Sequence, residues 1–124
     1  MNLFKDAPVI YSYSRKQAIE DGVLIDITDV AKEAGFRFPV AITASVYALA
    51  VPPKNSHEDE DGRIWDMVWM LHCATKNMIP SRKPSPDLTF YRLKIGRSYV
   101  ELKAQCGPGD DEEPVITIML PSED

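Results

Sequence analysis

Cysteine is scarce in this chain of 124 residues, which contains only Cys73 and Cys106. Two cysteines cannot make the disulfide framework of a small secreted domain, so we expect reduced thiols and a cytosolic protein. No apolar run approaches the ~20 residues that a membrane-spanning helix needs. The opening residues MNLFKD also lack the cationic start and apolar core of a signal peptide. We therefore expect no association with a membrane.

Histidine is equally scarce, and the two present are His57 and His72. The chain has neither the GxSxG nor the HExxH signature of known hydrolases. The spacing of its histidines and cysteines matches no zinc-site pattern. The sequence therefore predicts no catalytic residue, no metal and no cofactor. An enzyme that acts on a nucleotide, with His72 as its acid or base, is kept as a third hypothesis.

Acidic residues are numerous but unevenly placed, and the net charge is −5 from 19 acids and 14 bases. Ten of the acids fall in three short stretches, 58–61, 110–113 and 123–124. The rest of the chain is therefore positively charged. Such stretches are usually solvated loops. The alternative is an acidic surface for a basic protein partner, for which the candidate partner-binding residues are Asp110, Asp111 and Glu112.

The composition, with 44% hydrophobic and 27% charged residues, is that of a globular protein. The length suits one domain, which we place over residues 1–124. Two polar, proline-bearing stretches predict loops within it. These are a flexible acidic loop near residues 52–62 and a proline-rich loop near residues 80–87.

The first 50 residues predict short strands and short helices in alternation. We expect a strand over 8–13, followed by a helix that is capped by Ser14 and ends at Gly22. A strand over 23–27 comes next, followed by a helix that is capped by Thr28 and ends at Gly35. The following stretch, 36–51, is ambiguous. It is either an extended segment followed by a helix capped by Thr43, or one buried strand, and its alanine-rich sequence favours the helix.

Residues 63–79 predict the central helix of the protein. At 100° per residue, one broad apolar face gathers seven side chains: Ile64, Met67, Val68, Leu71, Ala74, Thr75 and Met78. A second stripe holds Trp65, Trp69, His72 and Lys76. Since the first face already supplies a core, the second packs under a loop or meets another chain, most simply in a homodimer. We name Trp65, Trp69 and His72 as candidate partner-binding residues.

The remainder predicts an antiparallel β-meander. Residues 88–95 and 98–106 alternate between an apolar and a largely charged face, with a turn at Gly96 and Arg97, and residues 114–120 form a last strand. The fold class is therefore α+β, a two-layer domain in which a C-terminal meander packs against the amphipathic helix. The meander interleaves bases with tyrosines, which suits a nucleotide or nucleic acid. The candidate anion-binding residues are Arg92, Lys94, Arg97 and Lys103.

Three stretches carry a resemblance to a known family. They are YSYSRKQAIEDGVLIDITDVAKEAGFRFPVAIT, DGRIWDMVWML and GPGDDEEPVITIMLPSED, in that order. Together they resemble a family of short uncharacterised proteins that occur in phages, plasmids and other mobile elements of bacteria. The resemblance implies an accessory protein in the cytoplasm of a bacterial host cell. Small proteins in that setting often counteract host defence, as anti-CRISPR and anti-restriction proteins do, but the family implies no functional residues.

Two hypotheses of function follow from these observations. The leading one is a non-enzymatic accessory protein that binds a bacterial host protein, supported by the missing catalytic constellation, the acidic loops and the tryptophan stripe. The alternative is a nucleotide- or nucleic-acid-binding module that uses the basic face of the meander.

Overall fold

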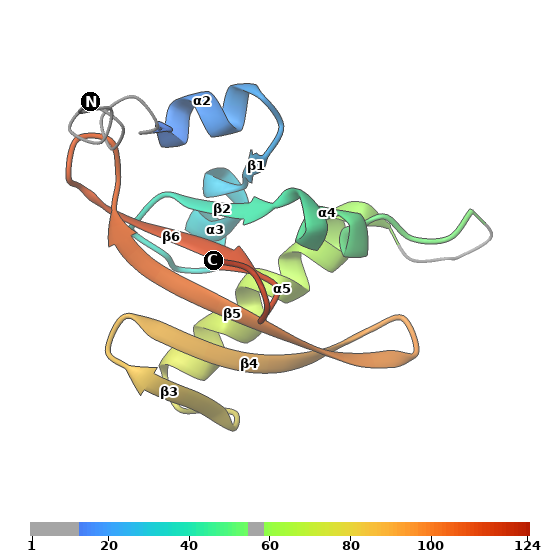
Figure 1. Cartoon of the computed structure of the whole chain (residues 1–124). Coiled ribbons are helices and arrows are strands. Elements are labelled where there is room, and N and C mark those ends of the chain that lie inside the picture. Colours follow the sequence, from blue (N-terminus) through green and yellow to red (C-terminus); the bar gives the residue numbers. More distant parts are fainter. Residues whose placement is uncertain (1–12, 55–58) are drawn as a thin grey trace.

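The computed structural model describes residues 13–54 and 59–124, which form four helices and one six-stranded sheet (Figure 1). The helices are α2 (Arg15–Glu20), α3 (Thr28–Glu33), α4 (Ala44–Ala50) and α5 (Glu60–Thr75). The strands are β1 (Leu24–Asp26), β2 (Val40–Thr43), β3 (Ser81–Ser85), β4 (Leu88–Ile95), β5 (Ser98–Pro108) and β6 (Pro114–Met119). Of the strand predicted over 8–13, all but Tyr13 lies outside the described residues, as do His57 and Glu58.

The order of strands in the sheet is β1-β2-β6-β5-β4-β3. The four C-terminal strands pair antiparallel with their neighbours in sequence, so the predicted meander is confirmed and has four strands. Strand β2 extends it by a parallel pairing with β6, and β1 pairs antiparallel with β2. The domain is therefore an α+β fold with a mixed, mostly antiparallel sheet.

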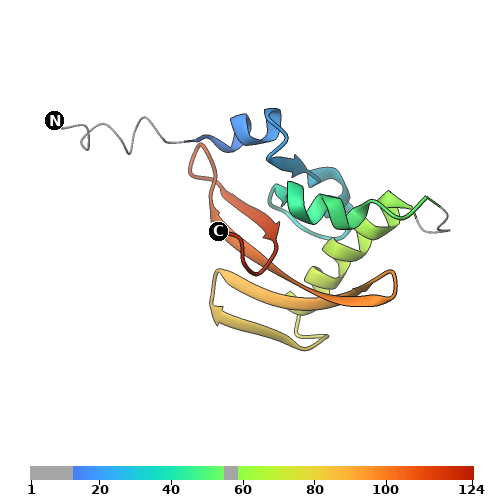
Figure 2. The same cartoon turned by 45° about the vertical axis from the view of Figure 1, so that its right-hand side comes forward.

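Helices α3, α4 and α5 cover one face of this sheet, and Figures 1 and 2 show α5 running behind its centre. The buried side of α5 matches the predicted apolar face from Ile64 to Ala74. Opposite it, Tyr91, Leu93 and Leu102 point inward from β4 and β5, as the alternation predicts. The Tyr91 hydroxyl donates to the Met67 carbonyl oxygen at 2.8 Å, and burial raises the pKa of that phenol. The core thus lies between α5 and the meander.

Two of the predicted helix caps are confirmed and one is wrong. The hydroxyls of Ser14 and Thr43 accept hydrogen bonds from the N–H groups of Gln17 and Val46, so residues 36–51 do form a strand followed by a helix. Thr28, however, is the first residue of α3, not its cap. Its hydroxyl accepts a hydrogen bond from the Val40 N–H at 3.2 Å and so ties α3 to β2.

Three boundaries differ from those predicted. The proline-rich stretch near 80–87 contains strand β3, because an edge strand with a register shift tolerates Pro84. The acidic loop near 52–62 ends earlier than predicted, since α5 begins at Glu60 with Asp59 as its cap. At its other end α5 stops at Thr75, so Met78 is 65% exposed and not part of the core. Across the described residues, the helices are too short and polar to cross a bilayer.

Candidate functional site

Among residues 13–54 and 59–124, no helix covers the side of β3, β4 and β5 that faces away from α5 (Figures 1 and 2). The pairing register places Phe90 opposite Lys103, Arg92 opposite Glu101, and Lys94 opposite Tyr99, while β3 adds Arg82 opposite Phe90. Paired residues share a face of a sheet, so these side chains form one surface. We call it the basic sheet face, and its members are Arg82, Phe90, Arg92, Lys94, Tyr99, Glu101 and Lys103.

Both aromatic rings of the basic sheet face lie beside a guanidinium group. The Arg82 guanidinium lies 3.9 Å from the centre of the Phe90 ring, and that of Arg92 lies 5.6 Å from the centre of the Tyr99 ring. Tyr99 is 67% exposed, so most of its ring faces solvent. A planar cation beside an exposed ring is an arrangement that receives flat π systems and anions together.

A pocket of about 520 Å³ opens on this face at the edge of β4, where β3 begins. Phe90, Arg92, Tyr99 and Glu101 line it from the strands. Its apolar floor comes from the end of α5 and the segment that follows, through Met70, Ile79 and Pro80. The pocket therefore combines an apolar floor, aromatic walls and a cationic rim, which are common features of small-ligand sites.

The predicted anion-binding residues are distributed as follows. Arg92, Lys94 and Lys103 share the basic sheet face, and Arg97 lies in the β4–β5 turn at its end. The turn itself depends on Gly96, whose φ is +64°. Phe90, Arg82 and Glu101 were missed as site residues. The alternation in sequence contains the signal for the first and the last, but Arg82 joins the surface only because residues 81–85 form β3.

A second surface lies on α5, where the rings of Trp65, Trp69 and His72 form one stack, which we call the aromatic stack. The Trp65 and Trp69 ring centres are 5.9 Å apart with an interplanar angle of 7°, and those of Trp69 and His72 are 5.3 Å apart at 16°. Phe36 meets His72 edge-on at 5.9 Å. The rings thus support one another, although Trp69 is still 39% exposed.

A glycine closes one end of the aromatic stack. Gly35 has a φ of +103°, and a Cβ atom at this position would lie 3.1 Å from Cε1 of His72. The glycine that ends α3 therefore also gives the His72 ring room to lie against the backbone.

The acidic turn between β5 and β6 contributes to the fold. The carboxylate of Asp110 accepts the N–H groups of Arg15 at 2.7 Å and Lys16 at 2.9 Å, which lowers its pKa. Neighbouring Asp111 and Glu112 are exposed, and Glu112 has a φ of +65°. Gly109 also lies in this turn, where a Cβ atom would meet the side chains of Glu113 and Val115. Partner binding by Asp110, Asp111 and Glu112 stays a prediction.

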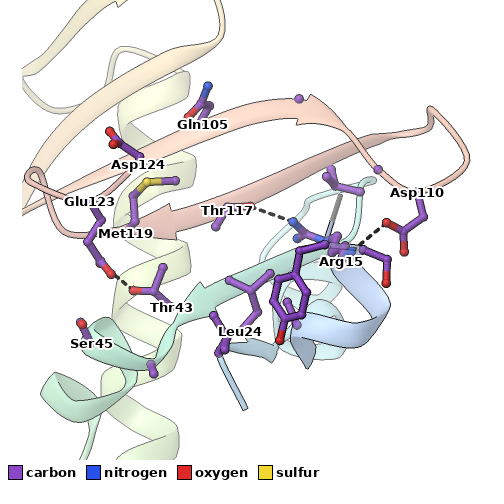
Figure 3. A pocket seen from close by; sticks show the side chains of 18 of the residues that line it. Arg15, Leu24, Thr43, Ser45, Gln105, Asp110, Thr117, Met119, Glu123 and Asp124 are labelled. Atoms are coloured by element: carbon purple, nitrogen blue, oxygen red, sulfur yellow. Dashed lines mark hydrogen bonds between the residues drawn. The ribbon is translucent and has the colours of Figure 1, made fainter. Parts of the chain in front are cut away.

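A second pocket, of about 740 Å³, lies over the β1-β2-β6 part of the same sheet face, beneath α2 (Figure 3). Arg15 donates to the Thr117 hydroxyl at 2.7 Å and to the Ile116 carbonyl at 2.8 Å. Glu123 accepts hydrogen bonds from the Thr43 hydroxyl and the Leu120 N–H, both at 2.8 Å. Burial lowers the pKa of Arg15. These ionic groups hold α2 and the C-terminal segment against the sheet.

Cys106 is a free, partly buried cysteine on β5. Burial and the nearby Asp87 carboxylate raise the pKa of the Cys106 thiol, which keeps it protonated. No three His, Cys, Asp or Glu side chains gather as a metal-binding group within 13–54 and 59–124.

The fold and these surfaces define an α+β protein with a six-stranded mixed sheet and an open basic face. The chain belongs to a family of unknown function, DUF6573, whose model matches residues 1–80. The matched stretch includes the aromatic stack and ends just before the strands of the basic sheet face. No curated protein and no solved structure matches the chain.

Proposed function

We propose that this protein binds single-stranded nucleic acid on the basic sheet face. One observation carries the proposal: the register of β3, β4 and β5 gathers four bases and two aromatic rings on a sheet face that none of the four described helices covers. Phosphates pair with the bases, and unpaired bases stack on the rings, which is how several sheet-based domains hold single strands.

The spacing of the basic sheet face favours an extended strand over a single nucleotide. Side chains on one face of a β-strand recur every ~6.8 Å. Phe90, Arg92 and Lys94 thus follow one another along β4, with Lys103 and Tyr99 beside the first and last of them. Cations and rings distributed over this length contact several nucleotides at once. A duplex hides the faces of its bases and offers nothing to the rings.

The setting that we propose is the cytoplasm of a bacterium that carries a phage, plasmid or other mobile element. The resemblance to accessory proteins of such elements supports it, and small proteins in that setting often counteract host defence. Single-stranded nucleic acid is an intermediate of replication, transfer and defence alike, so a small binding protein has targets in each.

The test is fluorescence anisotropy with labelled dT12 and U12 at 50 mM salt. We expect both to bind the unaltered protein and to lose binding to a variant with Arg92, Lys94 and Lys103 each changed to Glu. The matched control changes three exposed bases outside the face, Lys32, Arg37 and Lys54, to Glu. This control changes the net charge by the same amount. Its affinity therefore shows whether binding depends on the bases of the basic sheet face or only on the overall charge.

Two outcomes contradict the proposal. If neither oligonucleotide binds the unaltered protein at low salt, the basic sheet face is not a nucleic-acid surface. If TMP or UMP binds as tightly as its oligonucleotide, the ligand is a free nucleotide and the extended contact is wrong. Circular dichroism of the variants shows whether the fold is retained.

A second candidate function rests on the aromatic stack. Three stacked rings with Trp69 exposed form a rigid amphipathic surface, and tryptophan is enriched at the centres of protein interfaces. We propose that this surface binds a protein of the bacterial host, as anti-CRISPR and anti-restriction inhibitors do, with a homodimer as the alternative occupant.

Light scattering and a pull-down from host lysate test the second candidate. A Trp65→Ala, Trp69→Ala variant is expected to keep its circular dichroism spectrum and to lose either a captured host protein or a dimeric mass. The variant with Arg92, Lys94 and Lys103 changed to Glu is the control, because it leaves the aromatic stack intact. A monomer that captures nothing, and that unfolds when both tryptophans are removed, makes them part of the core.

A further inference from the structure

An acid stands in the middle of the basic sheet face. Glu101 lies opposite Arg92 in the register, between the rung of Phe90 and the rung of Tyr99. Its Oε2 atom lies 3.8 Å from a guanidinium nitrogen of Arg82. Both side chains are well exposed, at 62% for Arg82 and 40% for Glu101, so this loose pair contributes little to stability.

The Glu101 carboxylate is available to a ligand. Among the described residues, no donor makes a hydrogen bond to either of its oxygens, and the residue lines the 520 Å³ pocket. An acid at this position weakens the attraction of the face for phosphate. A surface that only held phosphates would gain by replacing it with a neutral residue, whereas a surface that reads a base edge uses such an acceptor.

We propose, resting on the function proposed above, that the pocket selects guanine and that Glu101 reads its Watson–Crick edge. Guanine presents two adjacent donors there, N1–H and the N2 amino group, which match the two oxygens of one carboxylate. Adenine and cytosine place a ring-nitrogen acceptor beside their amino group, and uracil places carbonyl oxygens on both sides of its N3–H. Those acceptors repel a carboxylate, so guanine alone pairs with it in a bidentate manner.

The neighbouring residues place a base for this contact. Tyr99 precedes Glu101 by two residues on β5, so both side chains are on the same face, about 6.8 Å apart along the strand. A purine stacked on the exposed Tyr99 ring bridges this distance, because the width of the purine and the length of a hydrogen bond together cover it. The Arg92 guanidinium, which lies over the Tyr99 ring, is placed to contact the adjacent phosphate.

The experiment compares labelled RNA hexamers that differ at one position: UUGUUU, UUAUUU, UUUUUU and UUIUUU, where I is inosine. Inosine keeps N1–H and lacks the N2 amino group. We expect the unaltered protein to bind UUGUUU about tenfold more tightly than the adenine and uracil hexamers, as one bidentate pair provides. UUIUUU is expected to bind several-fold more weakly than UUGUUU.

The variant Glu101→Gln isolates the contact. It is expected to lose the preference for guanine and to bind UUAUUU at least as tightly as UUGUUU, because an amide offers one donor and one acceptor, which match the edge of adenine. It should also bind UUUUUU at least as tightly as the unaltered protein, since a negative charge has been removed. The control Glu33→Gln removes an exposed acid from α3 and is expected to keep the preference for guanine.

The outcomes separate this inference from the function on which it rests. Equal binding of all four hexamers by the unaltered protein overturns guanine selection and leaves nucleic-acid binding in place. A preference for guanine that persists in Glu101→Gln overturns the role of Glu101. If no hexamer binds and dT12 and U12 also fail, the proposed function falls together with its selectivity.

Discussion

The two halves of the sheet surface that faces away from α5 use charged residues in opposite ways. Over β1, β2 and β6, the ionic groups Arg15, Glu123 and Asp110 all have hydrogen-bond partners within the protein (Figure 3). Over β3, β4 and β5, Lys94 and Lys103 make no ion pair or hydrogen bond with any other described residue. The first half, which we call the closed half, thus contributes to the fold, and the second, the open half, is free to meet a ligand.

The comparison shows that a pocket alone does not identify a site. The larger pocket lies in the half where the charged groups are satisfied, and the smaller one lies where exposed cations adjoin rings. Ionic groups that have good partners within the protein stabilise its structure. Exposed ionic groups without such partners have little effect on the free energy of folding and can bind a charged ligand. The two halves therefore differ in whether their charged groups have partners within the protein.

The largest effect that we expect on the fold comes from Arg15→Met. This change removes two charged hydrogen bonds, to Thr117 and Ile116, and should lower the free energy of unfolding by about 2 kcal/mol. Urea denaturation measures the loss, with Lys16→Met, an exposed neighbour, as control. Affinity for U12 should not change. A loss below about 0.5 kcal/mol would show that other contacts hold α2, and the contrast between the halves would weaken.

The matching test of the open half is Tyr99→Ala. Loss of one stacking ring should weaken binding of U12 about tenfold. The free energy of unfolding should change by less than about 1 kcal/mol, because the ring is 67% exposed. Tyr99→Phe keeps the ring and should keep the affinity. Equal affinity of all three proteins would remove Tyr99 from the site.

Local patterns in the sequence predict much of this fold. The period-two alternation in residues 88–106 identifies β4, β5 and their buried face, and it correctly groups Arg92, Lys94 and Lys103. The caps at Ser14 and Thr43 depend on residues three positions apart, so sequence reveals them as well. Features that depend on residues close together in sequence can therefore be predicted from the sequence.

Features that depend on distant parts of the chain were not predicted. The parallel pairing of β2 with β6 joins residues more than 70 positions apart, and Asp110 contacts α2 across 94 and 95 positions. The sequence predicts a loop where β3 lies, because proline indicates a break, yet an edge strand needs only one row of hydrogen bonds. Since Arg82 lies on β3, the pairing of this base with Phe90 and Glu101 was missed too.

Salt dependence gives a smaller and more quantitative test of the open half. Each phosphate that pairs with a base on a single strand contributes about −0.7 to the slope of log K against log salt concentration. If Arg92, Lys94 and Lys103 each contact one phosphate, the slope for U12 is about −2. Lys94→Gln should make it shallower by about 0.7, while Lys32→Gln leaves it unchanged. A slope near zero would mean that the bases do not contact phosphates.

The smallest effect that we expect concerns the pH dependence of the closed half. Hydrogen bonds from the N–H groups of Lys16 and Arg15 lower the pKa of Asp110 in the folded protein below its ordinary value of 3.8. A carboxyl group with a lowered pKa stabilises the fold above its unfolded pKa, and this contribution is lost as the pH falls through the folded pKa. Asp110→Asn keeps one acceptor oxygen but does not ionise, so the variant should lack that part of the pH dependence.

Thermal denaturation between pH 7 and pH 2.5 measures this difference. The melting temperature of the unaltered protein should exceed that of Asp110→Asn at pH 7, and the two should converge below pH 4. Asp111→Asn, whose side chain accepts no such pair of hydrogen bonds, should follow the unaltered protein throughout. If the difference in melting temperature between the unaltered protein and Asp110→Asn stays constant with pH, the charge of the Asp110 carboxylate does not hold α2 in place. Neutral hydrogen bonds would then stabilise the closed half instead.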